Sequence, residues 1–174
     1  GMGGVRLFAL SRDGSSWLDD PATFPIWERA ARLGAHVIVT ILYPQLEQLR
    51  RVLTRFPEIA VSLDHCAFPP LGRDPRSDAP ALFSLADRPN LHLKVSTNVL
   101  DGVRALGGEP ASAVEALVAA FGAERVMWGS DFCQTHDRPY AELVALARES
   151  FAGLSERDRE LCLAATARWL WAAL

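Results

Sequence analysis

The chain has 174 residues, of which 49% are apolar and 22% are charged, and its net charge is -3. This composition is that of a globular protein, and we expect a single domain over residues 1–174. It excludes the strongly basic surface that nucleic acids require, and no apolar run reaches the roughly 20 residues that cross a bilayer.

The cysteines and the first residues of the chain indicate the cellular compartment in which the protein works. The three cysteines, Cys66, Cys133 and Cys162, stand far apart, and none belongs to a CxxC pair. An odd number without paired spacing argues against a disulfide framework and favours a reducing environment. No segment resembling a signal peptide opens the chain, so we expect a cytoplasmic protein.

Five short apolar segments, taken in chain order, predict β-strands. The first, "GVRLFAL", is bounded by glycines and by the polar segment "SRDGSS". The second, "HVIVTILY", is apolar and rich in β-branched residues, which is typical of a strand buried on both faces. The expected strands are 4–10, 36–43, 58–65, 91–96 and 125–131.

Segments with helical periodicity separate these strands. In one of them, Pro44 stands at the start and leucines recur after it on a single stripe. The last begins at Ser155, with Asp158 three residues on, which is the spacing of a capping box. A proline-rich, charged loop at 68–80 is long for such a fold, and loops of this kind are usually functional or mobile. The expected helices are 23–34, 44–57, 81–89, 111–122, 139–151 and 154–174.

The alternation of strands and helices predicts an α/β fold. Helical crossovers join parallel strands through right-handed connections. Two architectures satisfy this pattern: an open doubly wound sheet and a (β/α) barrel. In both, functional side chains gather at the carboxyl ends of the strands. Those ends offer Arg6, Tyr43, Asp64–His65, Ser96 and Ser130–Asp131.

Two strand ends carry the best candidates for catalysis. The segment "RVMWGSD" ends in Asp131 after a Gly-Ser pair, and "EIAVSLDH" ends in His65. Asp131 can instead cap a turn, and His65 can be a core histidine bonded to a neighbouring carbonyl. Their positions at the ends of buried strands favour a role in proton transfer.

Cationic and hydroxyl side chains near the strand ends are candidates for binding an anion. Arg6 lies inside an apolar strand, and a buried guanidinium needs a carboxylate, either from the fold or from a substrate. Lys94 has apolar neighbours on both sides, and we expect it to pair with an interior acid as a structural residue. Tyr43, at the end of the second strand, and Arg104, in the loop after the fourth, are further candidates for contact with a substrate.

Four segments, in this order, resemble the amidohydrolase-related family of TIM-barrel hydrolases: "GVRLFAL", "RFPEIAVSLDHCAFP", "NLHLKVS" and "FGAERVMWGSDF". They span essentially the whole chain, and the last is the most specific. The resemblance implies a partial (β/α) TIM barrel that covers about strands 4–8 and their helices. It makes Asp131, on the eighth strand, the catalytic aspartate that activates water, and His65, on the sixth, the active-site histidine.

The chain departs from the family in ways that concern its completeness and metal binding. The family opens with a strand that carries His-x-His, a motif that does not occur here, and a typical barrel has about 250 residues. We therefore expect a C-terminal fragment, a chain whose upstream units belong to another chain, or a degraded homologue. The segment "TILYPQ" lacks the histidine of metal-binding relatives, so we expect no required cofactor. If one divalent metal such as zinc binds, Asp131 and His65 are its expected ligands.

By this resemblance we expect a hydrolase that acts on a small carboxylated lactone or a related ester-like substrate. Asp131 would be the general base, and His65 would polarise or protonate the substrate. Arg6, together with Tyr43 or Arg104, would hold an anionic group.

Two alternatives stay open, namely a metal-dependent decarboxylase of the same family and a truncated non-catalytic remnant or oligomer scaffold. Because a five-stranded parallel sheet has two exposed edges, we also expect a homo-oligomer. Neither nucleic acid nor a membrane is an expected partner.

Overall fold

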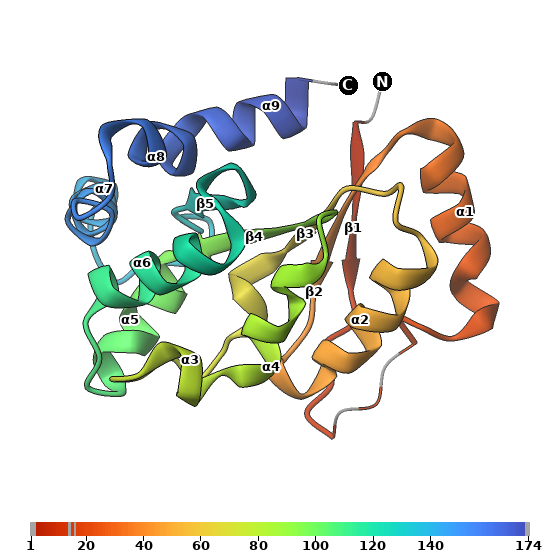
Figure 1. Ribbon diagram of the computed structural model, residues 1–174, viewed down its shortest axis with the longest axis horizontal. Coiled ribbons are helices and arrows are strands. Elements are labelled where there is room, and N and C mark those ends of the chain that lie inside the picture. Colours follow the sequence, from red (N-terminus) through yellow and green to blue (C-terminus); the bar gives the residue numbers. More distant parts are fainter. Residues whose placement is uncertain (1–2, 14, 16, 173–174) are drawn as a thin grey trace.

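The computed structural model describes residues 3–13, 15 and 17–172, and its centre is a five-stranded parallel sheet (Figure 1). The strands are β1 (Gly4–Phe8), β2 (His36–Thr40), β3 (Val61–Leu63), β4 (Leu91–Ser96) and β5 (Val126–Gly129). All five predicted strands are present, and each except β4 is shorter than expected.

The order of the strands decides between the two α/β architectures. The strands follow one another across the sheet in chain order, and every neighbouring pair is parallel. A doubly wound sheet changes direction at a switch point, whereas a (β/α) barrel adds each strand beside the last. The described residues therefore form an arc of a barrel, as the sequence predicted.

Nine helices of the described chain connect and flank these strands. They are α1 (Phe24–Leu33), α2 (Leu46–Arg55), α3 (Pro75–Asp78), α4 (Pro80–Phe83), α5 (Thr97–Ala105), α6 (Pro110–Phe121), α7 (Tyr140–Ser150), α8 (Glu156–Glu160) and α9 (Thr166–Ala172). None of the helices in this part of the chain has both the length and the apolarity that a membrane crossing requires.

Helix α5 corrects the sequence prediction, which assigned these residues, including Arg104, to a loop. Gly102 and the β-branched residues of α5 give it a weak intrinsic helix propensity. The helix instead buries Val99, Leu100 and Val103. Tertiary packing, which local propensity does not reveal, therefore accounts for this helix.

Two predicted helices are interrupted in the structure. The segment 81–89 contains α4 followed by a 3-10 turn at Ser84–Asp87. The segment 154–174 contains α8 and α9, which a π-helical turn joins at Leu161–Ala165. The last two residues of that prediction, 173–174, lie outside the described chain.

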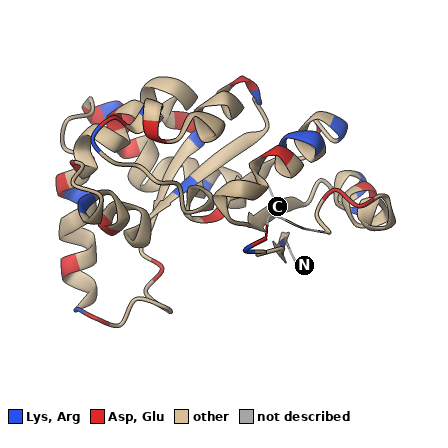
Figure 2. Cartoon of the chain, turned by 90° about the horizontal axis from the view of Figure 1, so that it is seen from below, with Lys and Arg blue, Asp and Glu red and all other residues tan. Residues whose placement is uncertain are grey.

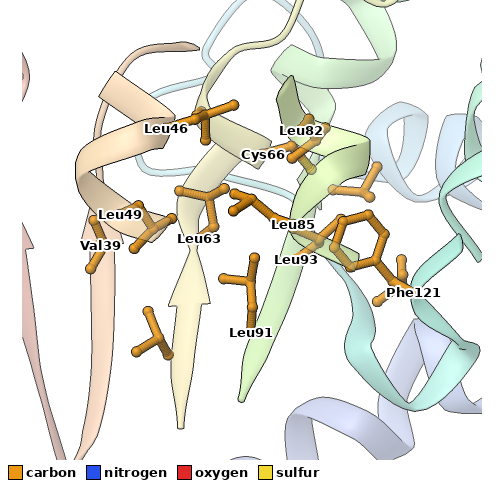
Figure 3. Packing of buried hydrophobic residues seen from close by; sticks show 14 of the residues in the cluster. Val39, Leu46, Leu49, Leu63, Cys66, Leu82, Leu85, Leu91, Leu93 and Phe121 are labelled. Carbon is orange, nitrogen blue, oxygen red and sulfur yellow. The ribbon is translucent and has the colours of Figure 1, made fainter. Parts of the chain in front are cut away.

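The two faces of the sheet have different chemistry. On the outer face, Val39, Leu63 and Leu93 are completely buried beneath the helices, where they pack with Leu49 and Phe121 (Figure 3). Most charged residues lie on the surrounding helices and loops (Figure 2). The inner face differs, because charged side chains of the strands line a cavity of about 330 Å³ there. The period-two alternation of strands separates these two environments.

Helix α1 packs against α2 through aromatic side chains. The completely buried ring of Trp27 stacks on Phe56, with 6.0 Å between the ring centroids, and Phe24 meets the same ring edge-on at 5.7 Å. Helix α1 ends at Gly34, whose φ of 60° is the left-handed conformation that suits a glycine C-cap. One flank of α1 is thus occupied by α2.

At the amino-terminal end of the sheet, two strand histidines contact the tryptophans of α9. His36 Nε2 lies 2.7 Å from Ser62 Oγ, and its ring centroid is 4.8 Å from that of Trp171. His92 lies 6.4 Å from Trp169 between ring centroids. Burial, aided by the neighbouring His92, lowers the pKa of His36 to about 4. The fold therefore favours the neutral imidazole at this position.

Acidification should accordingly destabilise the protein. The pKa of His36 is about 4 in the fold and 6.5 ordinarily, so the unfolded chain binds more protons between these values. Neutral His36 therefore contributes its full share to the free energy of unfolding above pH 6.5. That share is lost as the pH falls toward 4. Urea unfolding should show a loss of about 2 kcal/mol from this histidine between neutral pH and about pH 5.

The variant His36→Gln keeps a hydrogen-bonding group toward Ser62 but does not titrate, so its unfolding free energy should depend less on pH. The control His136→Gln removes an exposed histidine and shows whether the effect is specific to His36. An identical pH dependence in His36→Gln and the wild type would contradict this assignment.

Candidate active site

Strand β3 leads into a turn with a rare backbone conformation. After Asp64, the residues His65–Phe68 have positive φ angles of 53°, 51°, 65° and 53°. Left-handed backbone costs a residue with a Cβ roughly 1–2 kcal/mol. Two side-chain contacts stabilise the turn: within it the Phe68 ring stacks on His65 at 4.6 Å, and the Cys66 thiol donates to the Lys94 carbonyl oxygen of β4 at 3.5 Å. The predicted strand 58–65 is shorter in the structure because this turn begins at its end.

His65 and Asp131 face each other at the carboxyl end of the sheet. The Nε2 atom of His65 lies 3.8 Å from Oδ2 of Asp131, and each side chain is only 9% exposed. Asp131 lies just beyond β5 and also has a positive φ, of 53°. The structure thus brings together the two residues that the sequence selected as candidates for proton transfer.

Hydrogen bonds from the start of α5 hold both side chains in place. Ser96 Oγ lies 2.7 Å from His65 Nδ1, and Asn98 Nδ2 donates to Asp131 Oδ2 at 3.1 Å. Between them, Thr97 donates to the carbonyl oxygen that precedes Asp131, at 2.9 Å. Three consecutive residues therefore fix the relative positions of the imidazole and the carboxylate.

The surroundings of His65 favour its neutral form. Burial lowers the pKa of His65, and the positive charge of Lys94 lowers it further, whereas the carboxylates of Asp131 and Asp64 act in the opposite direction. The contact between neutral His65 and Asp131 is therefore not an ion pair. The 3.8 Å between His65 Nε2 and Asp131 Oδ2 is also longer than a hydrogen bond, which measures about 2.7–3.2 Å. The two groups can therefore both hydrogen-bond to one ligand oxygen.

The Asp64 carboxylate is the centre of a charge cluster on the inner face. It is 1% exposed and lies 2.6 Å from Arg6 Nη2 and 3.1 Å from Lys94 Nζ. Thr40 donates a further hydrogen bond to it at 2.9 Å. These contacts confirm that Lys94 pairs with an interior acid and identify a carboxylate of the fold as a partner of Arg6. Two cations against one carboxylate leave a net positive charge beside the cavity.

Gly129 of the "GSD" segment makes room for this cluster. A Cβ atom at this position would lie 2.7 Å from Cε of Lys94, which is closer than non-bonded carbon atoms approach. A side chain here would therefore push Lys94 away from Asp64. Packing against the lysine accounts for the glycine at the end of β5.

Tyr43 and Arg104 have partners in other parts of the fold. The Tyr43 hydroxyl accepts a hydrogen bond from the Ala81 amide at 3.1 Å, and the residue lines a separate small pocket beside α2 and α4. Arg104 pairs with Glu149 of α7 at 3.4 Å. Of the three residues predicted to bind substrate, only Arg6 joins the cavity on the inner face.

Comparison with known proteins agrees with this geometry. The sequence profile of the amidohydrolase family matches residues 1–172. The chain belongs to the amidohydrolase family. It is 33% identical over 136 residues to L-fucono-1,5-lactonase of Burkholderia ambifaria, and the matched region is 74% of this chain and 45% of the lactonase. The family predicted from the sequence is confirmed.

Solved structures show the same fold in longer amidohydrolases. A proposed 2-pyrone-4,6-dicarboxylic acid hydrolase from Pseudomonas putida is 27% identical, with a TM-score of 0.80 over 98% of this chain and 63% of that chain. An amidohydrolase from Burkholderia multivorans with bound zinc is 22% identical, with a TM-score of 0.70 over 97% of this chain and 64% of that chain. This amidohydrolase chain thus spans less than two-thirds of these structures and less than half of the lactonase.

Among the described residues, the donor groups of this amidohydrolase chain do not form a complete metal centre. No group of three or more His, Cys, Asp or Glu side chains suited to a metal occurs within the described part of the chain. His65 and Asp131 supply two neighbouring donors, whereas a catalytic zinc takes about three protein ligands. A metal at this position would need ligands from outside the described residues. The expectation that no cofactor is required stays a prediction.

Polar residues of the site were missed in the sequence, among them Thr40 and Asn98. Thr40, the last residue of β2, donates to Asp64, and Asn98, in the first turn of α5, donates to Asp131. Thr40 was missed because the predicted strand continued to Tyr43, whereas β2 ends at Thr40 in the structure. Asn98 could be found only by recognising that a helix starts directly after Ser96.

The charge cluster predicts a large effect of neutralising its carboxylate. Asp64→Asn should lower the free energy of unfolding by about 3 kcal/mol, because it leaves the charge of Lys94 partly buried without its counter-ion. Urea unfolding at neutral pH measures this loss. The matched control Asp87→Asn removes an exposed carboxylate that pairs with Arg50, and it should cost no more than about 0.5 kcal/mol. Equal losses in the two variants would show that burial of the pair is unimportant.

Proposed function

We propose that this chain carries the acid–base centre of a lactone hydrolase whose substrate is a small carboxylated lactone. The observation that carries the proposal is the placement of His65 and Asp131, which lie 3.8 Å apart at the carboxyl end of the sheet. Such a pair can hydrogen-bond to a water molecule and to a substrate oxygen at the same time. The positively charged cavity of the inner face supports the choice of an anionic substrate.

Hydrolysis at this pair needs one base and one hydrogen-bond donor. Asp131 accepts a proton from water as the water oxygen bonds to the lactone carbonyl carbon. Neutral His65 donates from Nε2 to the carbonyl oxygen, while Ser96 holds its Nδ1. The tetrahedral intermediate then breaks its ring C–O bond, and the leaving oxygen takes the proton from Asp131. One water is consumed, and the product is a hydroxy acid or its enol equivalent.

Arg6 and Lys94 provide the attraction for a substrate carboxylate. Both line the cavity of about 330 Å³, and Arg6 is 41% exposed despite its ion pair, so its remaining N–H groups can meet a ligand. A guanidinium suits a carboxylate because two of its N–H groups can bond to both oxygens. Tyr43 and Arg104 have no part in this binding, because neither residue lines the cavity.

The relatives support a lactone as the substrate class. One is named L-fucono-1,5-lactonase, and another is named for the hydrolysis of 2-pyrone-4,6-dicarboxylic acid, a lactone with two carboxyl groups. The metal-dependent decarboxylase has no comparable support, because none of the relatives described above is named for a decarboxylation.

The proposal predicts the effect of removing the base. Asp131→Asn should lower kcat at least about a hundredfold, because the amide cannot accept the proton of water. Titration of the acid released from L-fucono-1,5-lactone and from 2-pyrone-4,6-dicarboxylate measures turnover, and circular dichroism checks the fold. The control Asp137→Asn removes an exposed carboxylate of the same loop and should leave kcat unchanged.

Unchanged turnover in folded Asp131→Asn would exclude this aspartate as the base. Failure of the wild-type protein to hydrolyse either lactone would contradict the proposed function as a whole.

A further inference from the structure

The residue that precedes α5 is a serine whose hydroxyl does not cap the helix. Ser96 is the last residue of β4 and also the N-cap residue of α5. Serine is favoured at this position because its oxygen can accept a hydrogen bond from a free backbone amide of the first turn. Ser96 makes no such bond. Its hydroxyl is directed to another partner instead.

Ser155 shows the ordinary use of a serine at an N-cap in the same chain. Its Oγ atom accepts a hydrogen bond from the Asp158 amide at 3.1 Å, at the start of α8. Ser96 Oγ lies 2.7 Å from Nδ1 of His65, a residue 31 positions away in the chain. At the start of α5, contact with the imidazole thus takes the place of a helix cap.

One arrangement of hydrogens in this contact satisfies both groups. Ser96 is 0% exposed, and among the residues that the structure describes its hydroxyl has His65 Nδ1 as its only hydrogen-bond partner. If Nδ1 carried the proton, it would donate to the serine oxygen, and the buried serine hydrogen would have no acceptor. A buried donor without an acceptor is costly. The hydroxyl therefore donates, and Nδ1 accepts.

The opposite side of the imidazole favours the same arrangement. Nε2 of His65 faces Oδ2 of Asp131 at 3.8 Å, and Asn98 Nδ2 donates to that oxygen at 3.1 Å. Oδ2 therefore acts as an acceptor. A proton on Nε2 points toward this oxygen, whereas a lone pair on Nε2 would face the lone pairs of the carboxylate. Electrostatic repulsion thus disfavours the tautomer in which Nε2 is unprotonated.

We infer that Ser96 is a positioning residue that holds His65 as the tautomer with its proton on Nε2. The hydrogen bond at one ring nitrogen of a histidine decides which nitrogen carries the proton. Here that bond comes from a buried serine of β4, the strand beside β3. The proton of His65 is thereby directed into the gap between His65 and Asp131.

The tautomer matters for hydrolysis, and in this respect the inference rests on the proposed function. Burial and the charge of Lys94 lower the pKa of His65, which favours the neutral ring, and a neutral ring donates from one nitrogen only. Ser96 makes this donor the nitrogen that faces the ligand. The bond from Nε2 to the lactone carbonyl oxygen then strengthens as negative charge develops there in the transition state. Ser96 itself is buried and acts through His65.

Nitrogen NMR of the wild-type protein tests the tautomer directly. Protein that contains isotope-labelled histidine gives signals from four imidazoles, and the variant His65→Gln identifies the signals of His65 by their loss. At neutral pH we expect a protonated Nε2 and an unprotonated, hydrogen-bonded Nδ1. Spectra that place the proton of His65 on Nδ1, on both nitrogens or equally on either would overturn the inference.

Variants of Ser96 test its part in this arrangement. Ser96→Ala removes the donor to Nδ1, so a second tautomer of His65 should appear in the spectrum. In the same variant, kcat for the lactones of the proposed function should fall at least about tenfold. KM should change little, because the bond from Nε2 is strongest in the transition state. Ser96→Thr keeps a hydroxyl and should retain the single tautomer and most of the wild-type kcat.

Ser150→Ala is the matched control. Ser150 is 2% exposed, and its hydroxyl donates to the Leu146 carbonyl oxygen within α7 at 2.7 Å. Loss of this buried hydroxyl, which is remote from the imidazole, should leave the His65 spectrum and kcat unchanged. Circular dichroism checks the fold of each variant.

Two results from the variants would also overturn the inference. One is an unchanged His65 spectrum in folded Ser96→Ala. The other is an equal loss of kcat in Ser96→Ala and Ser96→Thr, which would assign the effect to packing instead of the hydroxyl. The spectra need no substrate. Absence of lactone turnover in the wild type would therefore count against the proposed function, while the tautomer of His65 is decided independently.

Discussion

The buried carboxylate of Asp64 joins much of the sheet. It lies at the end of β3, and it receives an ion pair from Arg6 of β1 and another from Lys94 of β4. Thr40 of β2 adds a hydrogen bond. A carboxylate that is 1% exposed would be strongly destabilising without such partners. The polar residues of neighbouring strands therefore lie side by side on the inner face. Their contacts with the Asp64 carboxylate link the strands of the partial barrel.

The same carboxylate shapes the candidate active site. It keeps Lys94 in the interior, and the lysine in turn favours neutral His65. Ser96 then leaves the Nε2 atom of His65 directed at Asp131. The ion pairs of Asp64 with Arg6 and Lys94 thus affect both the stability of the fold and the electrostatics of the candidate site. A change that loosens the ion pairs of Asp64 also alters the protonation of the neighbouring imidazole.

The sequence was sufficient for the strands, because the outer face of each strand must be apolar to pack against helices. The choice of a barrel over a doubly wound sheet came from the resemblance to the amidohydrolase-related family. The sequence also indicated that Arg6 and Lys94 need acidic partners. It could not identify Asp64 as their shared partner, since that pairing depends on strand register. Arg104 was misplaced in a loop because burial, more than local propensity, accounts for α5. The left-handed turn after β3 could not be predicted, because "DHCAF" contains no glycine to signal it.

That turn has a consequence for the order in which the molecule folds. Its backbone opposes the intrinsic preference of every residue in it, so the segment is locally frustrated. The contacts that offset this cost join it to β4, through the Lys94 carbonyl and the Ser96 hydroxyl, at sequence separations of 28 and 31 residues. The left-handed conformation therefore becomes favourable only after β3 and β4 have paired. His65 should be among the last residues to reach its native geometry, which makes the candidate site a late product of folding and the first region to respond when the contact between these strands weakens.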